Sequence, residues 1–455
     1  MSMSLPHFHA TPLRRLPLAA LLSLAFAGAS QAQSLVDIYE MAKGYDATYQ
    51  SAKAQYDANL AKADQGKAQL LPQVGLSAGA TRSQRDVTPT TAPSTTNYNY
   101  TTQTAGINAT QPLYRPANLA TYRQSQKSLE LAQAALNQAE QDLVVRVSQA
   151  YFDVLSAQDS LAFVQAQKAA VAEQLASAKR NFEVGTATIT DTREAQARFD
   201  LVTAQEIAAD NDLRVKTVAL ELLVGKAGLK PVRLQSGVNL PAVDGQGVDS
   251  WIAQSEQNHP TIRQARVNLD VAKLETEKAV AGHKPTVDLT LGYNSQKNIN
   301  GTSIQLTGVT NQINVASAGI TFNLPLYAGT ATQNRIRETT ALEEKARMDL
   351  EGAQRQVTQA TRTAYLGLQS GLGQVKAYEA AEASSQVALD ANKLGYQVGV
   401  RINIDVLNSQ SQLYQTKRDL AKARYDVLVG QLKLRQAAGV LKAEDLQPIN
   451  ALLAP

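Results

Sequence analysis

The longest uninterrupted helix-forming stretch covers residues 117–184, ANLATYRQSQKSLELAQAALNQAEQDLVVRVSQAYFDVLSAQDSLAFVQAQKAAVAEQLASAKRNFEV. It contains neither proline nor glycine, the residues that most strongly disfavour a helix interior. Leucine or alanine recurs every seven residues, with further apolar positions between, at Leu129, Leu136, Leu143 and Ala150 and at Ala132, Ala139, Val147, Val154 and Leu161. Heptads are typical of coiled-coil packing, so the stretch predicts one helix ~100 Å long.

Two shorter helical segments flank this long one. Residues 35–69 and 191–223 each predict a helix of ~50 Å. Gly185 provides the turn between the long helix and the second short one. Because two short helices end to end match one long helix, we expect a rod in which they stack beside it.

The chain is internally duplicated. Segments match at an offset of 213 residues, which becomes 214 after one inserted residue. The matching pairs include 45–57 with 258–270, 111–114 with 324–327, 182–185 with 396–399, and Asp191 with Asp405. A fixed offset over most of the chain indicates two copies of one structural unit. We therefore divide the chain into repeat one at 33–230, a linker at 231–247, repeat two at 248–445 and a C-terminal tail at 446–455.

Each repeat also contains two predicted strands. In residues 73–84, apolar Val74, Leu76, Ala78 and Ala80 alternate with polar Gln73, Ser77 and Thr81. This period of two predicts a strand, and a second follows at about 98–111, closed by Pro112. Repeat two has the same pattern around Val287, Leu289, Leu291 and Tyr293 and around Ile320, Phe322 and Leu324. Polar loops at 86–97 and near 298–311 join the strands of each pair.

Four amphipathic strands in one chain suit a sheet with one face in lipid and the other in water. Open sheet edges are not tolerated in hydrocarbon, and single-chain membrane barrels begin at eight strands. Several copies of the chain would therefore have to share one barrel. The alternative is that these are ordinary strands of a soluble α+β protein.

Residues 1–32 are expected to be a signal peptide. Arg14 and Arg15 precede an apolar run at 16–27, and small residues ending at Ala32 suit cleavage. The remaining chain carries a formal charge of +2, too little to indicate nucleic acid as a partner. With no cysteine and four histidines, two of them in this leader, the composition argues against disulfides, thiolate metal sites, cofactors and an enzyme active site.

The chain resembles the TolC family of outer-membrane channel proteins. The resemblance rests on the Pro-Leu-Tyr sequences at 112–114 and 325–327 and on the hairpin sequences at 182–191 and 395–407. It implies an α+β membrane protein: a trimer with a shared twelve-stranded barrel in the outer membrane and an α-helical barrel crossing the periplasm. Such a trimer is an exit duct for type I protein secretion or drug efflux. Its partners are a periplasmic adaptor and an inner-membrane pump, either an ABC transporter or proton-driven.

The resemblance also implies a gate near the tips of the helical hairpins. Tyr396 would hydrogen bond to Asp191, and Arg401 would contact Thr190. Two alternatives remain open. Asp191 with Glu194 three residues later forms the pattern of a capping box with Asp191 as N-cap. Tyr396 aligns with Phe182 of repeat one, which suits apolar packing.

The narrowest point of the duct is implied at Asp405. Three carboxylates around one axis would favour cations and raise one another's pKa. The family often has a second aspartate three residues later, where this chain has Asn408, so weaker cation selectivity is expected. A helix N-cap is the competing role for Asp405, as for Asp191.

Four residues at the hairpin turns are the expected adaptor-docking tips: Val184, Gly185, Val398 and Gly399. Glycine suits these tight turns in any case. The main alternative function is a periplasmic coiled-coil structural or adaptor protein, disfavoured because no compact β domain or inner-membrane tether is visible. The sequence does not distinguish protein secretion from small-molecule efflux.

Overall fold

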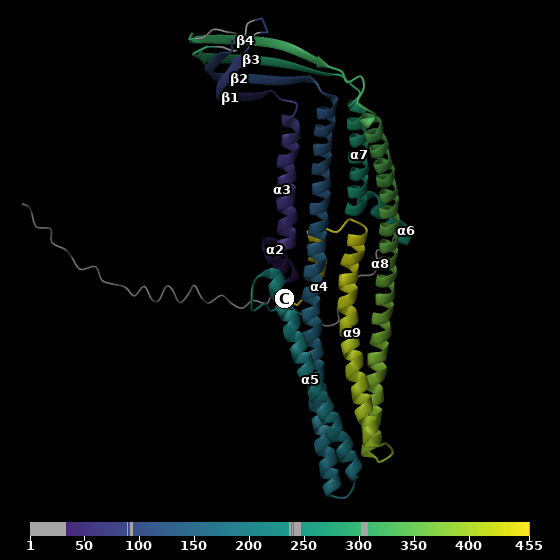
Figure 1. The fold of residues 1–455 in the computed structure, drawn as a ribbon. Coiled ribbons are helices and arrows are strands. Elements are labelled where there is room, and N and C mark those ends of the chain that lie inside the picture. The colour runs from purple at the N-terminus through teal and green to yellow at the C-terminus, as the bar shows by residue number, and fades with distance from the viewer. Residues whose placement is uncertain are drawn as a thin grey trace, which may run out of the picture.

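The computed structural model describes residues 33–88, 90–91, 94–235, 238, 240, 247–301 and 308–454. The expected signal peptide therefore lies outside the described residues, as do most of the linker and parts of both polar loops. The helices form a long rod with the sheet across one end (Figure 1).

The same order of elements occurs twice, which confirms the duplication. Repeat one contains α2 (Leu35–Tyr45), α3 (Ala47–Ala68), β1 (Gln73–Val87), β2 (Thr96–Tyr114), α4 (Pro116–Glu183) and α5 (Ile189–Val224). Repeat two contains α6 (Val248–Asn258), α7 (Pro260–Ala281), β3 (Thr286–Ile299), β4 (Asn311–Asn323), α8 (Ala331–Gln397) and α9 (Asn403–Ala437). A 3-10 turn (Ala443–Asp445) and α10 (Leu446–Asn450) follow.

The long helix is confirmed: α4 spans 68 residues, and its counterpart α8 spans 67. In Figure 1, α3 and α5 lie in line along α4, and α7 and α9 lie in line along α8. The expected end-to-end stacking of short helices beside long ones is thus what the structure shows. None of the described helices combines the length and apolar character that crossing a lipid bilayer requires.

The core lies at the middle of the rod, where α2 packs against α4, α5 and the C-terminal segment, and α9 packs against α4. Its largest fully buried side chains include Ile38, Tyr39, Leu143, Tyr151, Phe152, Leu428 and Leu432. Burial raises the pKa of Tyr151 and Tyr425, and both phenols find acceptors. Tyr151 donates to the Val232 carbonyl at 2.8 Å, and Tyr425 donates to Asp159 at 2.7 Å.

Two expectations about element boundaries were wrong. The helix expected at 35–69 is broken at Asp46, whose backbone leaves the helical region and whose side chain accepts from the Tyr49 N–H at 2.7 Å. Strand β2 does not end at Pro112 but runs to Tyr114, because an irregularity in register between Pro112 and Tyr114 accommodates the missing N–H.

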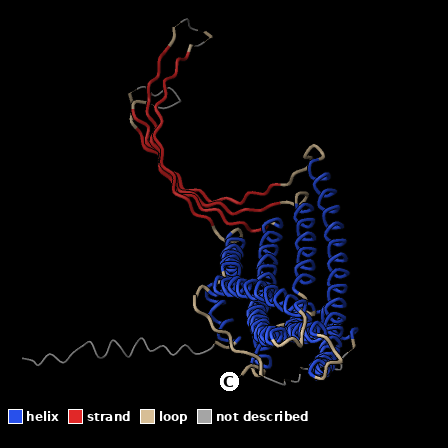
Figure 2. The backbone as a smooth tube through the Cα atoms, turned by 90° about the horizontal axis from the view of Figure 1, so that it is seen from below, coloured by secondary structure: helices blue, strands red, loops and turns tan. Residues whose placement is uncertain are grey.

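The four strands form one antiparallel sheet in the order β1-β2-β3-β4, and it curves away from the helices (Figure 2). The register gathers apolar side chains on one face: Val74, Leu76, Ala78, Ala80, Ala105, Ile107, Ala109, Leu289, Leu291, Tyr293, Ala316, Ala318, Ile320 and Phe322. The other face is mainly polar, with Ser77, Thr81, Thr102, Thr104, Asn108, Thr290, Asn294, Gln296, Asn298 and Ser317. Ile313 and Val315 are apolar exceptions there.

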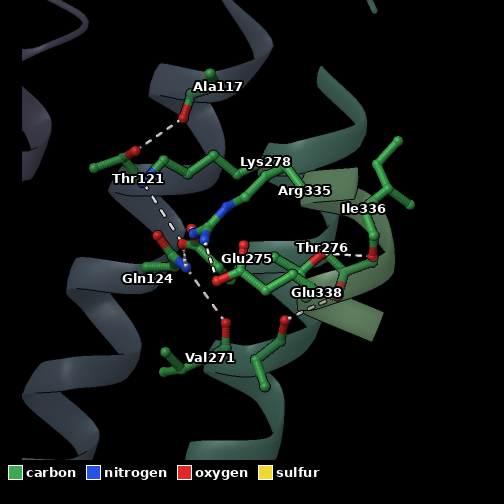
Figure 3. Close-up of polar contacts among 12 residues, drawn as sticks. Ala117, Thr121, Gln124, Val271, Glu275, Thr276, Lys278, Arg335, Ile336 and Glu338 are labelled. Atoms are coloured by element: carbon green, nitrogen blue, oxygen red, sulfur yellow. Dashed lines mark hydrogen bonds and ion pairs between the residues drawn. The ribbon is translucent and has the colours of Figure 1, made fainter. Parts of the chain in front are cut away.

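Polar contacts join the two repeats where the rod meets the sheet. Arg115, at the start of α4, donates twice to Asp288 of β3, at 2.7 and 2.6 Å. Further along, Figure 3 shows Glu275 of α7 between Gln124 of α4 and Arg335 of α8. Gln124 and Arg335 donate to its two oxygens at 2.8 and 2.6 Å. Hydrogen bonding, first from Gln124, lowers the pKa of Glu275.

A second ion pair fastens α3 to α4 in the middle of the rod. Arg146 donates to both oxygens of Asp46, at 2.9 and 3.0 Å, and Asp46 is 6% exposed. The hydrogen bond from Arg146 is the main reason that the pKa of Asp46 lies below its ordinary value. A carboxylate with a lowered pKa stabilises the fold above its unfolded-state pKa, and this stabilisation disappears as the pH falls through the folded-state pKa.

We therefore expect Arg146→Gln to lower the free energy of unfolding by about 1–3 kcal/mol at pH 7, since Asp46 loses a charged partner. The difference from the unsubstituted protein should shrink as the pH falls below ~4. Circular dichroism of denaturant unfolding in detergent at pH 7 and pH 3 measures both effects. Arg214→Gln is the control, because the ion pair of Arg214 with Asp210 lies on the surface. Equal losses of unfolding free energy in the Arg146 and Arg214 variants would contradict this account of Asp46.

Candidate functional site

Two helical hairpins, α4–α5 and α8–α9, end far from the sheet (Figure 1). Gly185 and Gly399 occupy the two turns with φ of 80° and 79°. No atom would obstruct a Cβ at either position, so the left-handed backbone alone is what favours glycine there. The neighbouring Val184 and Val398 are 73% and 65% exposed. Each hairpin thus ends in an exposed apolar side chain on a tight turn.

The start of α5 differs from the expected capping box. Thr188 is the N-cap, and its N–H and hydroxyl donate to Asp191 at 2.9 and 2.7 Å. Asp191 is therefore the third residue of the helix. The expected capping box, with Asp191 as N-cap and Glu194 three residues later, is wrong. The reason is that α5 already begins at Ile189. Thr190, the second residue of the helix, is exposed.

The N-cap role considered for Asp405 is also wrong. Helix α9 begins at Asn403, with Ile402 as N-cap, so Asp405 lies in the first turn. A carboxylate there still interacts favourably with the positive end of the helix dipole. Its side chain is 32% exposed and forms an ion pair with Arg401 at 3.7 Å.

Three of the four expected gate residues line one cavity of about 660 Å³ between the two hairpins, and Thr190 does not. Asp191, Tyr396 and Arg401 all line it. Within the described part of this chain, however, Tyr396 does not bond to Asp191 and Arg401 does not reach Thr190. The Tyr396 hydroxyl instead lies 3.5 Å from the Asn181 amide, and its ring packs beside Leu389, Val406 and Leu413. Both gate contacts therefore stay predictions for an assembly of chains.

Sequence reasoning missed Asn403, which is fully buried at this cavity. Its amide nitrogen donates to the Asp191 carbonyl at 3.1 Å, and its oxygen accepts from Gln174 at 2.5 Å. A buried amide with both ends satisfied joins α9 to α4 and α5 specifically. The duplication held a signal, since Asn403 occupies the position of apolar Ile189 in repeat one.

Asn408 lies three residues after Asp405 on α9 and is exposed. Its side-chain oxygen accepts from Arg198 of α5 at 2.8 Å. Sequence reasoning missed Arg198, because its partner is 210 residues away. The structure thus places two arginines, Arg198 and Arg401, beside the pair of residues expected at the narrowest point.

These groups make exchangeable polar contacts, which suit a surface that opens and closes. Among the described residues, no group of three or more histidine, aspartate or glutamate side chains could hold a metal ion. The arrangement can gate or filter a passage by hydrogen bonding and charge.

Comparison with known proteins gives a consistent result. The family model described as "Outer membrane efflux protein" matches residues 38–226 and 251–440, one match in each repeat. The chain is 34% identical to "Outer membrane protein TolC" of Vibrio cholerae over 92% of this chain and 94% of that relative. It is 30% identical to TolC of Escherichia coli K12, over 96% and 89%. It is 32% identical to "Alkaline protease secretion protein AprF" of Pseudomonas aeruginosa, over 92% and 87%.

A solved structure supports the fold. The outer membrane protein VceC of Vibrio cholerae matches with a TM-score of 0.74 and 19% identity, over 89% of this chain and 96% of that structure. The family match and the similar relatives set aside the alternatives of a soluble α+β protein, a periplasmic structural or adaptor protein and an enzyme. Because the family model covers both repeats and two relatives match at over 30% identity along most of their length, this chain belongs to the outer membrane efflux protein family, as an export channel of the outer membrane.

Proposed function

We propose that three copies of this chain form the exit duct of a tripartite export system. The duct would receive its cargo from an inner-membrane pump, an ABC transporter or a proton-driven one, and a periplasmic adaptor would join the two. One relative is named for protease secretion and the family for efflux, so the proposed cargo covers both proteins and small molecules.

The observation that carries this proposal is a four-stranded sheet with one apolar face and two unpaired edges. In the described residues, β1 and β4 each pair with only one strand. Lipid can cover the apolar face, but backbone groups at those edges need partners in hydrocarbon. Two copies would make an eight-stranded barrel, and side chains fill the interior of a barrel of that size. Three copies are therefore the smallest ring that leaves a passage.

The helices offer surfaces for the same assembly. On α5, Leu201, Val215 and Leu222 fall on one heptad stripe and are exposed in the single chain. On α8, Leu366, Val387 and Leu394 form a second exposed stripe with the same spacing. Apolar heptad stripes normally lie in helix–helix interfaces. We infer that α5 of one copy packs against α8 of the next.

A cysteine pair tests this interface, since the chain has no cysteine of its own. Leu222 and Leu366 lie at similar heights, each ~50 Å from the hairpin turns. We expect the double variant Leu222→Cys with Leu366→Cys to give a covalent trimer after mild oxidation, seen on a non-reducing gel. Each single variant is the control and should stay uncrosslinked. Covalent ladders beyond three chains, or light scattering that shows single chains in detergent, would count against a trimer.

We propose that the cavity between the hairpins is the gate, and that Val184, Gly185, Val398 and Gly399 meet the adaptor. The support is that Asp191, Tyr396 and Arg401 line one cavity while the valines at the turns remain exposed. In the closed trimer, Tyr396 would bond to Asp191 and Arg401 to Thr190. Adaptor contacts at the turns would replace these bonds on opening.

Removing the gate bonds should open the duct. We expect Tyr396→Phe combined with Arg401→Ser to raise single-channel conductance in planar bilayers severalfold, since each charged link contributes about 1.5–3 kcal/mol. Tyr378→Phe is the matched control, because Tyr378 lies on the same helix but packs, partly buried, against the apolar cluster around Trp251. Conductance unchanged by the double substitution would exclude these residues from the gate.

Asp405 would provide the single acidic ring of the duct, with Asn408 beside it. We expect Asp405→Ala to weaken block by hexamminecobalt(III) about tenfold or more, because a ring of three carboxylates is removed. The control is Asp390→Ala, whose carboxylate lies on α8 with Gln386 as its partner. Block that persists unchanged in the Asp405 variant would place the constriction elsewhere.

A further inference from the structure

Arg198 forms no ion pair with a carboxylate in the part of the chain that the structure describes. Among the described residues, its only hydrogen-bond or ion-pair partner is the neutral amide of Asn408, at 2.8 Å. The bond crosses from α5 to α9 and is made at an exposed position. Asn408 therefore holds the guanidinium in place without neutralising it.

This charge lies close to Asp405. Asn408 follows Asp405 by three residues, so the guanidinium held there is about one helical turn, ~5 Å along the axis, from the level of that carboxylate. Exposed charges at such a spacing interact, because the Debye length is ~8 Å at physiological ionic strength. Arg401 approaches the same carboxylate from the other side, at 3.7 Å.

We propose that Arg198 is a selectivity-determining residue of the constriction. Its positive charge, positioned by Asn408, offsets the acidic ring of Asp405 and reduces the preference of the duct for cations. This inference rests on the proposed function, in which Asp405 and Asn408 surround the passage. Each copy then contributes the carboxylate of Asp405 and the guanidinium of Arg198 at this level.

The chemistry of the pair supports this role. A guanidinium stays protonated throughout the physiological pH range, so the offset is permanent. A carboxylate at position 408 would form an ion pair with Arg198 and cancel its charge. An amide accepts the same hydrogen bond and leaves the charge intact, so Asn408 is a positioning residue for a basic ring.

The test uses the full-length protein in planar bilayers with a potassium chloride gradient. We expect Arg198→Gln to shift the reversal potential toward cation selectivity and to lower the concentration of hexamminecobalt(III) needed for block by about tenfold, which corresponds to ~1.4 kcal/mol. Arg198→Lys keeps the charge and should resemble the unsubstituted channel. Arg193→Gln, an exposed arginine on the same helix, is the matched control and should also leave selectivity unchanged.

Three outcomes would overturn the inference. Unchanged selectivity in Arg198→Gln would show that its charge does not act on the passage. Equal shifts in the Gln and Lys variants would show that Arg198 acts through packing rather than charge. An equal shift in Arg193→Gln would show a general effect of surface charge. Failure of the unsubstituted protein to form channels would instead contradict the proposed function. Recordings of the unsubstituted channel therefore distinguish failure of the proposed function from failure of the inference about Arg198.

Discussion

The structure depends on one constraint: every backbone N–H and C=O in the hydrocarbon of a membrane needs a hydrogen-bond partner. The sheet of one chain meets this need between its strands but leaves β1 and β4 each with an unpaired edge. Its apolar face suits lipid, and its polar face suits water. The strands of a single copy are therefore incomplete in the outer membrane, and the proposed trimer would give both edges a partner.

Charged and polar contacts hold the helical rod beneath this sheet to a single geometry. Arg115 with Asp288 ties the start of α4 to β3, and Glu275 links α4, α7 and α8. These contacts cross between the repeats. At the opposite end, hydrogen bonds connect the hairpins, and the buried amide of Asn403 joins α9 to both α4 and α5. Ion pairs fix the rod at the sheet end, while hydrogen bonds to neutral amides join the tips, which suits a passage gated at its periplasmic end.

Local patterns predicted the elements well, while contacts between distant residues were not predictable. The heptads and the absence of glycine and proline were enough for α4, and strict alternation was enough for β1. The break at Asp46 was missed although Gly44 lies two residues before it, because the break depends on the side chain of Asp46, which caps α3. The cap of α5 was placed three residues late, because Thr188 and Asp191 are both suitable caps. The Arg198–Asn408 bond joins residues 210 positions apart, and no local pattern encodes it.

The central claim is that neighbouring copies pair with the open edges of the sheet. Amide hydrogen exchange of the protein in lipid nanodiscs tests this claim most directly. If copies close one barrel, peptides from β1 and β4 will be protected as strongly as peptides from β2 and β3. Rapid exchange confined to β1 and β4 would show that these edges are unpaired and would contradict the account.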